Sequence, residues 1–197
     1  MLPIQAKPEP ANFDLNVRQP GLNVLLIHPN PTEKEWKGKE FWQKSLPELR
    51  TAYNQICVYS STWIPHSTGT HSVDHFIPKK LRPDLAYEWS NFRYVSTRFN
   101  SRKGLKTILD PFLMVEFLFQ IDFKTLFIKP NAAIVDNAVL VSVQNTIKIL
   151  KLNDDDELVK ERFEYCTLYW NNEITFDYLS KKVPLIALEL QRQNLIN

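Results

Sequence analysis

The sequence contains little cysteine and no long apolar run. Its 197 residues include only two cysteines, Cys57 and Cys166, which lie far apart in the chain. Two such thiols provide neither a disulfide framework nor a complete cysteine-only zinc site, so a reducing cytoplasm is the expected compartment. No run of about 18 apolar residues is present, and residues 1–10 lack the basic-then-apolar pattern of a signal peptide. These absences argue against a membrane-spanning or secreted protein.

Several common catalytic motifs are absent as well. The chain has no Walker A sequence, no Gly-x-Ser-x-Gly and no Gly-x-Gly-x-x-Gly, so NTP hydrolysis, serine hydrolase chemistry and dinucleotide binding lack support. His66, His71 and His75 have a spacing that suggests a zinc hydrolase, but no His-Glu-x-x-His is present. A metalloprotease is therefore not supported, and His66 is interpreted as an ordinary loop residue.

The composition is that of a globular protein, and the expected fold class is α+β. Hydrophobic residues make up 44% of the chain and charged residues 23%, which excludes wholesale disorder. We expect an extended, proline-rich arm over 1–31, a core with preceding helices over 32–112, and a strand pair with C-terminal helices over 113–197 in the same compact domain.

The spacing of apolar residues and the turn residues predict both helices and strands along the chain. Helices are expected over 33–44, 46–55, 97–103, 136–152, from 154–157 onward, and over 185–195. Strands are expected over 56–59, 73–77, 91–95, 113–119 and 123–128. Capping boxes are predicted at Thr32 with Glu35 and at Ser45 with Glu48, and a helix stop is predicted at Gly104.

Basic charge gathers in one window of the chain. Residues 66–106 hold eight basic and three acidic side chains, although the whole chain carries only +2. Three of the four histidines lie in the same window. Basic charge around potential general bases favours a polyanionic substrate such as nucleic acid, whereas the alternative is a solvated surface with satisfied histidines.

Residues of this window have the chemistry that phosphodiester hydrolysis requires. A neutral histidine can activate water, and carboxylate and amide oxygens suit Mg²⁺. Asp74 and His75 are adjacent, so on a strand they share a site only if the strand twists or ends there, as Pro78 favours. Asn100 and Lys103 are three apart, which places both on one face of a short helix. The alternative for Asp74 and His75 is a salt-bridged turn pair.

The order Asp74-His75, then Asn91, then Asn100 followed by Lys103 resembles the HNH endonuclease family, whose ββα-metal core is a hairpin and one helix. The resemblance implies that His75 is the general base and that Asp74 and Asn100 bind the catalytic Mg²⁺ or Mn²⁺. It also implies that Asn91 steadies the loop and the base. The expected fold is this core embedded in a mainly helical domain.

The flanks extend the resemblance. Pro8–Asp14, Val17–Gly21, Leu85–Asn91 and Leu109–Phe112 are similar to a bacterial HNH subfamily that includes nuclease subunits of Septu-type anti-phage defence, which are encoded beside an ATPase. The resemblance implies DNA cleavage in antiviral defence with an ATPase partner. RNA as the substrate stays open.

One departure concerns the structural zinc that many relatives bind through two Cys-x-x-Cys pairs. At those positions this chain has Cys57, Ser60, Ser96 and Phe99, so three of four thiolates are missing. A tetrahedral site cannot be built from one thiol, and we predict no structural zinc. Aromatic packing is expected in its place, from Phe99, Phe92 or Trp63.

Basic side chains around the motif are expected to contact the nucleic-acid backbone: His71, Lys79, Lys80, Arg82, Arg102 and Lys103. Phosphate contacts carry no sequence information, so cleavage is expected to be weakly specific unless a partner directs it. The alternative function is a binding subunit whose nuclease centre is latent or inactive, with apolar helix surface at Leu185, Leu188 and Leu195 for a partner.

Overall fold

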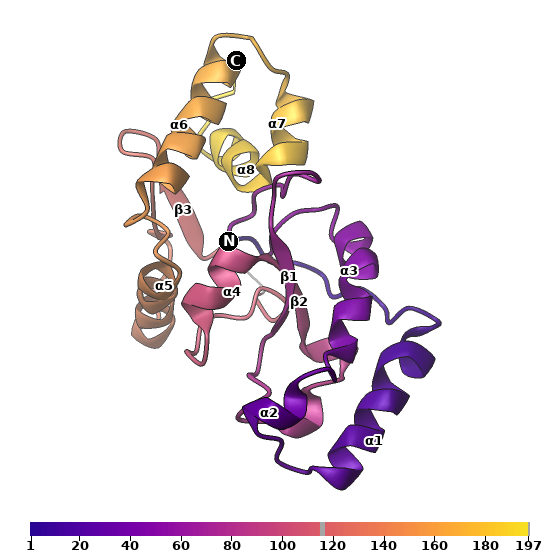
Figure 1. Ribbon diagram of the computed structural model, residues 1–197. Coiled ribbons are helices and arrows are strands. Elements are labelled where there is room, and N and C mark those ends of the chain that lie inside the picture. Colours follow the sequence, from indigo (N-terminus) through magenta and orange to yellow (C-terminus); the bar gives the residue numbers. More distant parts are fainter. Residues whose placement is uncertain (115–116, 197) are drawn as a thin grey trace. The chain divides into compact units, whose positions relative to one another are not determined.

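The computed structural model describes residues 1–114 and 117–196, which form two compact units. The hairpin unit comprises Gln5–Gln55 and Ile64–Leu105, and the helical unit comprises Met1–Ile4, Ile56–Trp63 and the residues from Lys106 onward. The predicted α+β class is confirmed, since the described residues form helices α1–α8 and two small antiparallel sheets (Figure 1). The hairpin unit ends at Leu105. The core expected from the sequence extended to residue 112. No described helix is both long and apolar enough to cross a membrane.

The expected extended arm is wrong from residue 14 onward, because a π-helical turn (Asp14–Arg18) leads into α1 (Gln19–Ile27). Pro20 lies in the first turn of α1, where a missing N–H breaks no helical hydrogen bond. The side chain of Arg18 forms ion pairs with three acidic residues, Glu9, Asp14 and Glu88. Proline therefore marks the helix start here instead of preventing a helix.

The hairpin unit is built around a two-stranded antiparallel sheet followed by a helix. Strand β1 (His71–His75) pairs with β2 (Phe92–Ser96), and α4 (Thr97–Lys103) packs on both strands (Figure 1). The register places Asp74 opposite Arg93 and His75 opposite Phe92. Gly104 ends α4 with φ +50°, a conformation that glycine adopts without strain, as predicted.

Short helices precede the hairpin, α2 (Glu33–Trp36), a 3₁₀ turn (Phe41–Ser45) and α3 (Leu46–Ala52). Two further 3₁₀ turns, Pro83–Leu85 and Trp89–Asn91, lie between its strands. The capping box of Thr32 and Glu35 is confirmed. The box predicted at Ser45 is wrong, because its buried hydroxyl has no hydrogen-bond partner among the described residues.

The helical unit contains β3 (Phe119–Asp122), β4 (Phe127–Pro130), α5 (Asn137–Leu150), α6 (Asp156–Trp170), α7 (Phe176–Lys182) and α8 (Pro184–Arg192). The side chain of Asp136 caps α5 and that of Asp155 caps α6, so the acidic starts predicted for both helices are confirmed. Strand β3 pairs antiparallel with β4.

Three predicted strands differ from the structure. Part of the strand expected over 113–119 falls on residues 115 and 116, outside the described residues, and β3 begins only at its last residue. The strand expected over 123–128 is a tight turn up to Leu126, whose N–H donates to the carbonyl of Asp122 at 2.6 Å. Residues 56–59 form no strand, because Ile56 makes a single bridge to Trp63 across a turn.

Candidate functional site

A cleft in the hairpin unit brings together the side chains that the sequence singled out. Asp74, His75 and Asn100 line it, together with the basic pair Lys79 and Lys80. Strand β1 ends at His75, so two adjacent residues whose side chains alternate in direction both border one cleft. From the sequence, Asp74 and His75 were expected to share a site only if the strand twists or ends early. In the structure β1 does end at His75.

The imidazole of His75 is held in a defined orientation. Its Nε2 donates to the backbone carbonyl of Ala86 at 2.9 Å, so in the neutral ring the lone pair is on Nδ1. The rings of Trp42 and Phe92 lie edge-on at 4.8 and 5.4 Å between centroids. Burial lowers the pKa of His75 to about 4, against a smaller opposing effect of the Ala86 bond. The ring is therefore a neutral proton acceptor at physiological pH.

Lys103 does not lie at the surface, as a phosphate contact would require. Its ammonium is 3.2 and 3.1 Å from the two carboxylate oxygens of Asp74 and donates to the carbonyl of His75 at 2.9 Å. The side chains are only 1% and 4% exposed. The prediction that Lys103 binds nucleic acid is wrong, because a buried ammonium that holds β1 and α4 together cannot reach a phosphate without leaving its partners.

The amide of Asn100 also reaches back from α4 to β1. Its Nδ2 donates to Ser72 Oγ at 3.1 Å and to the Val73 carbonyl at 3.3 Å, which leaves Oδ1 as the atom able to bind a cation. No group of three His, Cys, Asp or Glu side chains with the arrangement of a metal site occurs in residues 1–114 and 117–196. The carboxylate of Asp74 with this amide oxygen still suits Mg²⁺ or Mn²⁺, because Mg²⁺ keeps several waters and uses few protein ligands.

Asn91 joins the two ends of the segment between β1 and β2. Its side chain accepts from the N–H of Ile77 at 2.8 Å and donates to the carbonyls of Ile77 and Leu85 at 2.9 and 3.1 Å. The residue is 5% exposed. Ala86, which holds the His75 ring, directly follows one of these carbonyls. The geometry therefore agrees with the loop-steadying role that the resemblance implies for Asn91.

The remaining basic residues have different environments. The ammonium of Lys79 lies over the rings of Trp36 and Trp42 at 5.7 and 5.4 Å, at the wall of the cleft. Arg82 is exposed and makes two hydrogen bonds to Asp84, at 2.8 and 2.6 Å. The guanidinium of Arg102 lies over the ring of Phe99 at 5.5 Å. Of these three, Lys79 is the one placed beside the His75 cleft.

His71 lies in a second groove of the hairpin unit. Its Nδ1 is 2.8 Å from the hydroxyl of Tyr94, and it shares the groove with Arg50 and His66. Arg50 donates to the ring of His66, so the residue interpreted as an ordinary loop histidine is part of a basic cluster. Burial, followed by the charge of Arg50, lowers the pKa of His71. Arg50 could not be identified from the sequence, because only the fold brings α3 to the start of β1.

Two of the three aromatic residues expected near the absent zinc positions are buried in the hairpin unit. Phe92 is fully buried, and Phe99 is 3% exposed. Trp63 belongs instead to the helical unit, where the ammonium of Lys182 lies 3.2 Å from its ring centroid. Phe92 therefore packs at the start of β2, against Phe13 and His75, and Phe99 is buried on α4.

Comparisons with protein-family models, with curated proteins and with solved structures found no match for this chain. The function must therefore be argued from the side chains of the hairpin unit and the cleft they form.

Proposed function

We propose that the protein is a metal-dependent endonuclease of HNH type that hydrolyses phosphodiester bonds in DNA. The observation that carries the proposal is the neutral imidazole of His75, fixed through Nε2 by Ala86, at the edge of a cleft that Asp74 and Asn100 also line. A base, two hard oxygen ligands and nearby cations are the groups that such hydrolysis needs.

Each of the four motif residues has a proposed role in hydrolysis. His75 accepts a proton from water at Nδ1, because its other nitrogen is committed to a carbonyl. Asp74 and Asn100 would hold the cation, which would supply charge stabilisation for the phosphate when bound. Asn91 keeps the loop, and through it the Ala86 carbonyl, in place. Cation binding to Asp74 requires its carboxylate to be shared with, or released by, Lys103.

Substrate binding is proposed to rest on the basic side chains of the cleft and the second groove. Lys79 and Lys80 lie at the wall next to His75, and Arg50 with His71 offers a second cationic site. These side chains are suited to backbone phosphates, so little sequence preference is expected without a partner. Anti-phage defence and an ATPase partner follow from the family resemblance and are part of the same proposal.

A plasmid-nicking assay tests the activity. Supercoiled DNA is incubated with the protein in Mg²⁺, Mn²⁺ or EDTA, beside His75→Ala and the control His28→Ala. His28 pairs with Glu35 and does not line the cleft. Nicking is expected to need the cation, to disappear in His75→Ala and to persist in His28→Ala, while DNA binding by anisotropy persists in all three. Equal nicking by His75→Ala would remove His75 from the mechanism.

A second function, a latent or inactive nuclease subunit that binds nucleic acid or a partner, is favoured by one contact. The Lys103 ammonium is bonded to both oxygens of Asp74, where an active centre would need the carboxylate for a cation. The partner surface expected at α8 is wrong for Leu185, which is 3% exposed because it packs into the helical unit. A binding-only protein shows no metal-stimulated nicking under any condition, whereas a latent enzyme gains it when its partner is added.

A further inference from the structure

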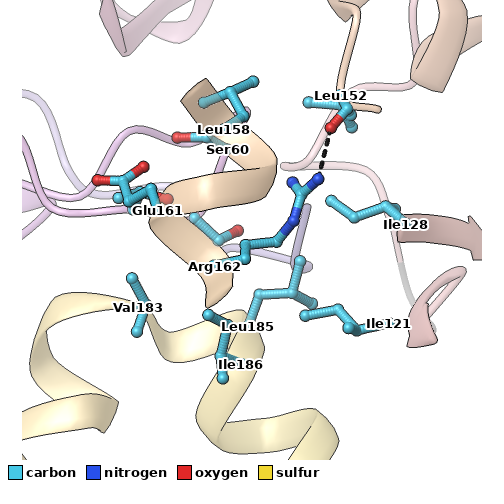
Figure 2. Close-up of a pocket in the computed structure, with 12 residues that line it drawn as sticks. Ser60, Ile121, Ile128, Leu152, Leu158, Glu161, Arg162, Val183, Leu185 and Ile186 are labelled. Atoms are coloured by element: carbon cyan, nitrogen blue, oxygen red, sulfur yellow. Dashed lines mark hydrogen bonds between the residues drawn. The ribbon is translucent and has the colours of Figure 1, made fainter. Parts of the chain in front are cut away.

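A small pocket in the helical unit encloses a charged side chain in apolar surroundings. Arg162, on α6, points into it, and Figure 2 shows the aliphatic side chains of Ile121, Ile128, Leu185 and Ile186 around the guanidinium. Arg162 is 9% exposed. A buried charge is tolerated in a protein when it is paired and hydrogen-bonded, so the partners of this guanidinium decide what the pocket can do.

The guanidinium has few partners. Its Nη2 donates to the carbonyl of Leu152 at 2.8 Å, and its Nε is a buried donor without a partner among the described residues. No carboxylate of residues 1–114 or 117–196 makes a salt bridge with it. Burial lowers the pKa of Arg162 to about 10, which leaves the group charged at physiological pH. A positive charge and an unused N–H are therefore present in a low-dielectric site.

A second buried polar atom without a partner comes from another segment. Ser61 lies in the turn that follows Ile56, with φ +56°, and lines the same pocket. It is 2% exposed, and its Oγ has no hydrogen-bond partner among the described residues. A buried hydroxyl without a hydrogen-bond partner is unfavourable, because the group has lost its bonds to water. Two orphaned groups, a cationic donor and a hydroxyl, at one pocket indicate that the pocket holds a ligand.

The nearest acids do not complete the site. Glu161 also lines the pocket, although it projects from the other side of α6 than Arg162 (Figure 2), and the side chain of Asp155 caps α6 by accepting from the N–H of Glu157 at 3.2 Å. Their charges raise the pKa of Arg162 less than burial lowers it. The positive charge at the pocket is therefore only partly balanced, which favours an anion over a neutral ligand.

The size of the pocket restricts the anion. The cavity has a volume of about 20 Å³, while a single water needs roughly 10–15 Å³ by the same measure. A sulfate, phosphate group or nucleotide is much larger than this cavity, whereas a single monatomic ion is close to it in size. We propose that the pocket binds a halide-sized anion, chloride under physiological conditions, between the Nε–H of Arg162 and the hydroxyl of Ser61.

The anion would link two parts of the helical unit that are distant in sequence. Ser61 belongs to the turn Ile56–Trp63 and Arg162 to the middle of α6. A ligand that binds the folded state alone stabilises it in proportion to the logarithm of its concentration. The consequence is a stability of this unit that depends on chloride itself and not on ionic strength.

Thermal unfolding of the full chain tests the proposal. The Tm is measured in NaCl, NaBr and sodium gluconate at equal ionic strength, for the wild type, Arg162→Met and Ser61→Ala. Lys160→Met is the control, because this exposed lysine of α6 pairs with Glu157 outside the pocket. We expect chloride and bromide to raise the Tm above that in gluconate for the wild type and the control, a smaller rise for Ser61→Ala, and none for Arg162→Met.

If Arg162→Met does not fold, crystals of the protein grown in bromide provide a second test. Anomalous scattering is expected to show one bromide within hydrogen-bond distance of Arg162 Nε in the wild type and a weakened peak in Ser61→Ala. A wild-type Tm that is the same in chloride and gluconate, with only water at Nε in the bromide crystals, would overturn the proposal and identify the pocket as a hydration site.

Discussion

Removal of the Lys103 ammonium tests the electrostatics of the hairpin unit most directly. The change is Lys103→Met, which keeps a similar unbranched chain and deletes the charge. The ammonium has three partners, both oxygens of Asp74 and the carbonyl of His75, all within 2.9–3.2 Å. Both side chains of the pair are nearly inaccessible to solvent. The substitution therefore removes the Lys103 ammonium from a buried carboxylate.

The expected loss follows from the burial of the pair. Breaking a buried ion pair by removing one partner costs about 3–5 kcal/mol, because the remaining charge stays desolvated. At about 1.4 kcal/mol for each factor of ten, the local opening constant rises roughly 100- to 4,000-fold. The double variant Asp74→Asn with Lys103→Met is expected to lose less than Lys103→Met alone, since both charges of the pair are then removed.

Urea unfolding and amide hydrogen exchange measure this loss. Both are done in EDTA, so that cation binding to Asp74 does not contribute, and exchange is followed for β1 and α4. Lys34→Met is the control, because Lys34 is an exposed residue of α2. A Lys103→Met protein within about 1 kcal/mol of the wild type, with unchanged exchange in β1 and α4, would refute the view that this pair fastens the helix to the hairpin.

Three further outcomes are expected. Gly21→Ala destabilises the hairpin unit by roughly 1–3 kcal/mol in urea unfolding, because a Cβ there would lie 2.1 Å from the ring of buried Tyr87; Asn23→Ala on the exposed side of the same helix is the control, and equal stabilities would contradict the close approach. Between pH 6.5 and about 4 the unfolded state binds the proton of His75 before the folded state does, because burial lowers its folded pKa to about 4. Stability is therefore lost as the pH falls through that window, by up to about 3 kcal/mol, and the difference between the stability-pH curves of wild type and His75→Gln isolates this loss; parallel curves would show that the histidine titrates normally. The thiol of Cys166 is fully buried and burial raises its pKa to about 12, so a thiol reagent at pH 8 reacts with it only after denaturant is added, and rapid labelling of the native chain would disagree.

Local signals in the sequence predicted the ends of several helices correctly. Thr32, Asp136 and Gly104 each act within one turn of the chain, through a side-chain cap or a positive φ, so their effect can be read without knowledge of the fold. Ser45 fails as a cap although its sequence context matches, because it ends a 3₁₀ turn and has helical φ and ψ instead of the extended conformation of a capping residue. The turn at Leu126 was predicted as strand, since an aromatic and aliphatic composition does not distinguish a strand from a turn that packs into a core.

The candidate site, too, could be predicted only in part from the sequence. The spacing of Asn100 and Lys103 predicted one helix face, and both side chains do reach β1. Their partners could not be predicted, because the choice between solvent and a buried carboxylate depends on how closely α4 approaches the sheet. The basic cluster around Arg50 is non-local for the same reason: no periodicity in α3 indicates which strand it meets.

Adjacent residues on a strand point to opposite faces, so Asp74 and His75 can border one cleft only if the strand twists or ends at these residues. In this chain β1 ends at His75, and the backbone beyond it is held by Asn91, whose carbonyl accepts from the N–H of Phe76 and whose side chain accepts from the N–H of Ile77. Side chains on opposite faces of a strand's last two residues can both border a cleft at its end, which is where Asp74 and His75 lie. The two faces also give the residues different environments, with a cation against Asp74 and aromatic rings around His75. One strand end thus keeps a charged carboxylate and a neutral imidazole side by side, as a site that combines a cation ligand with a general base requires.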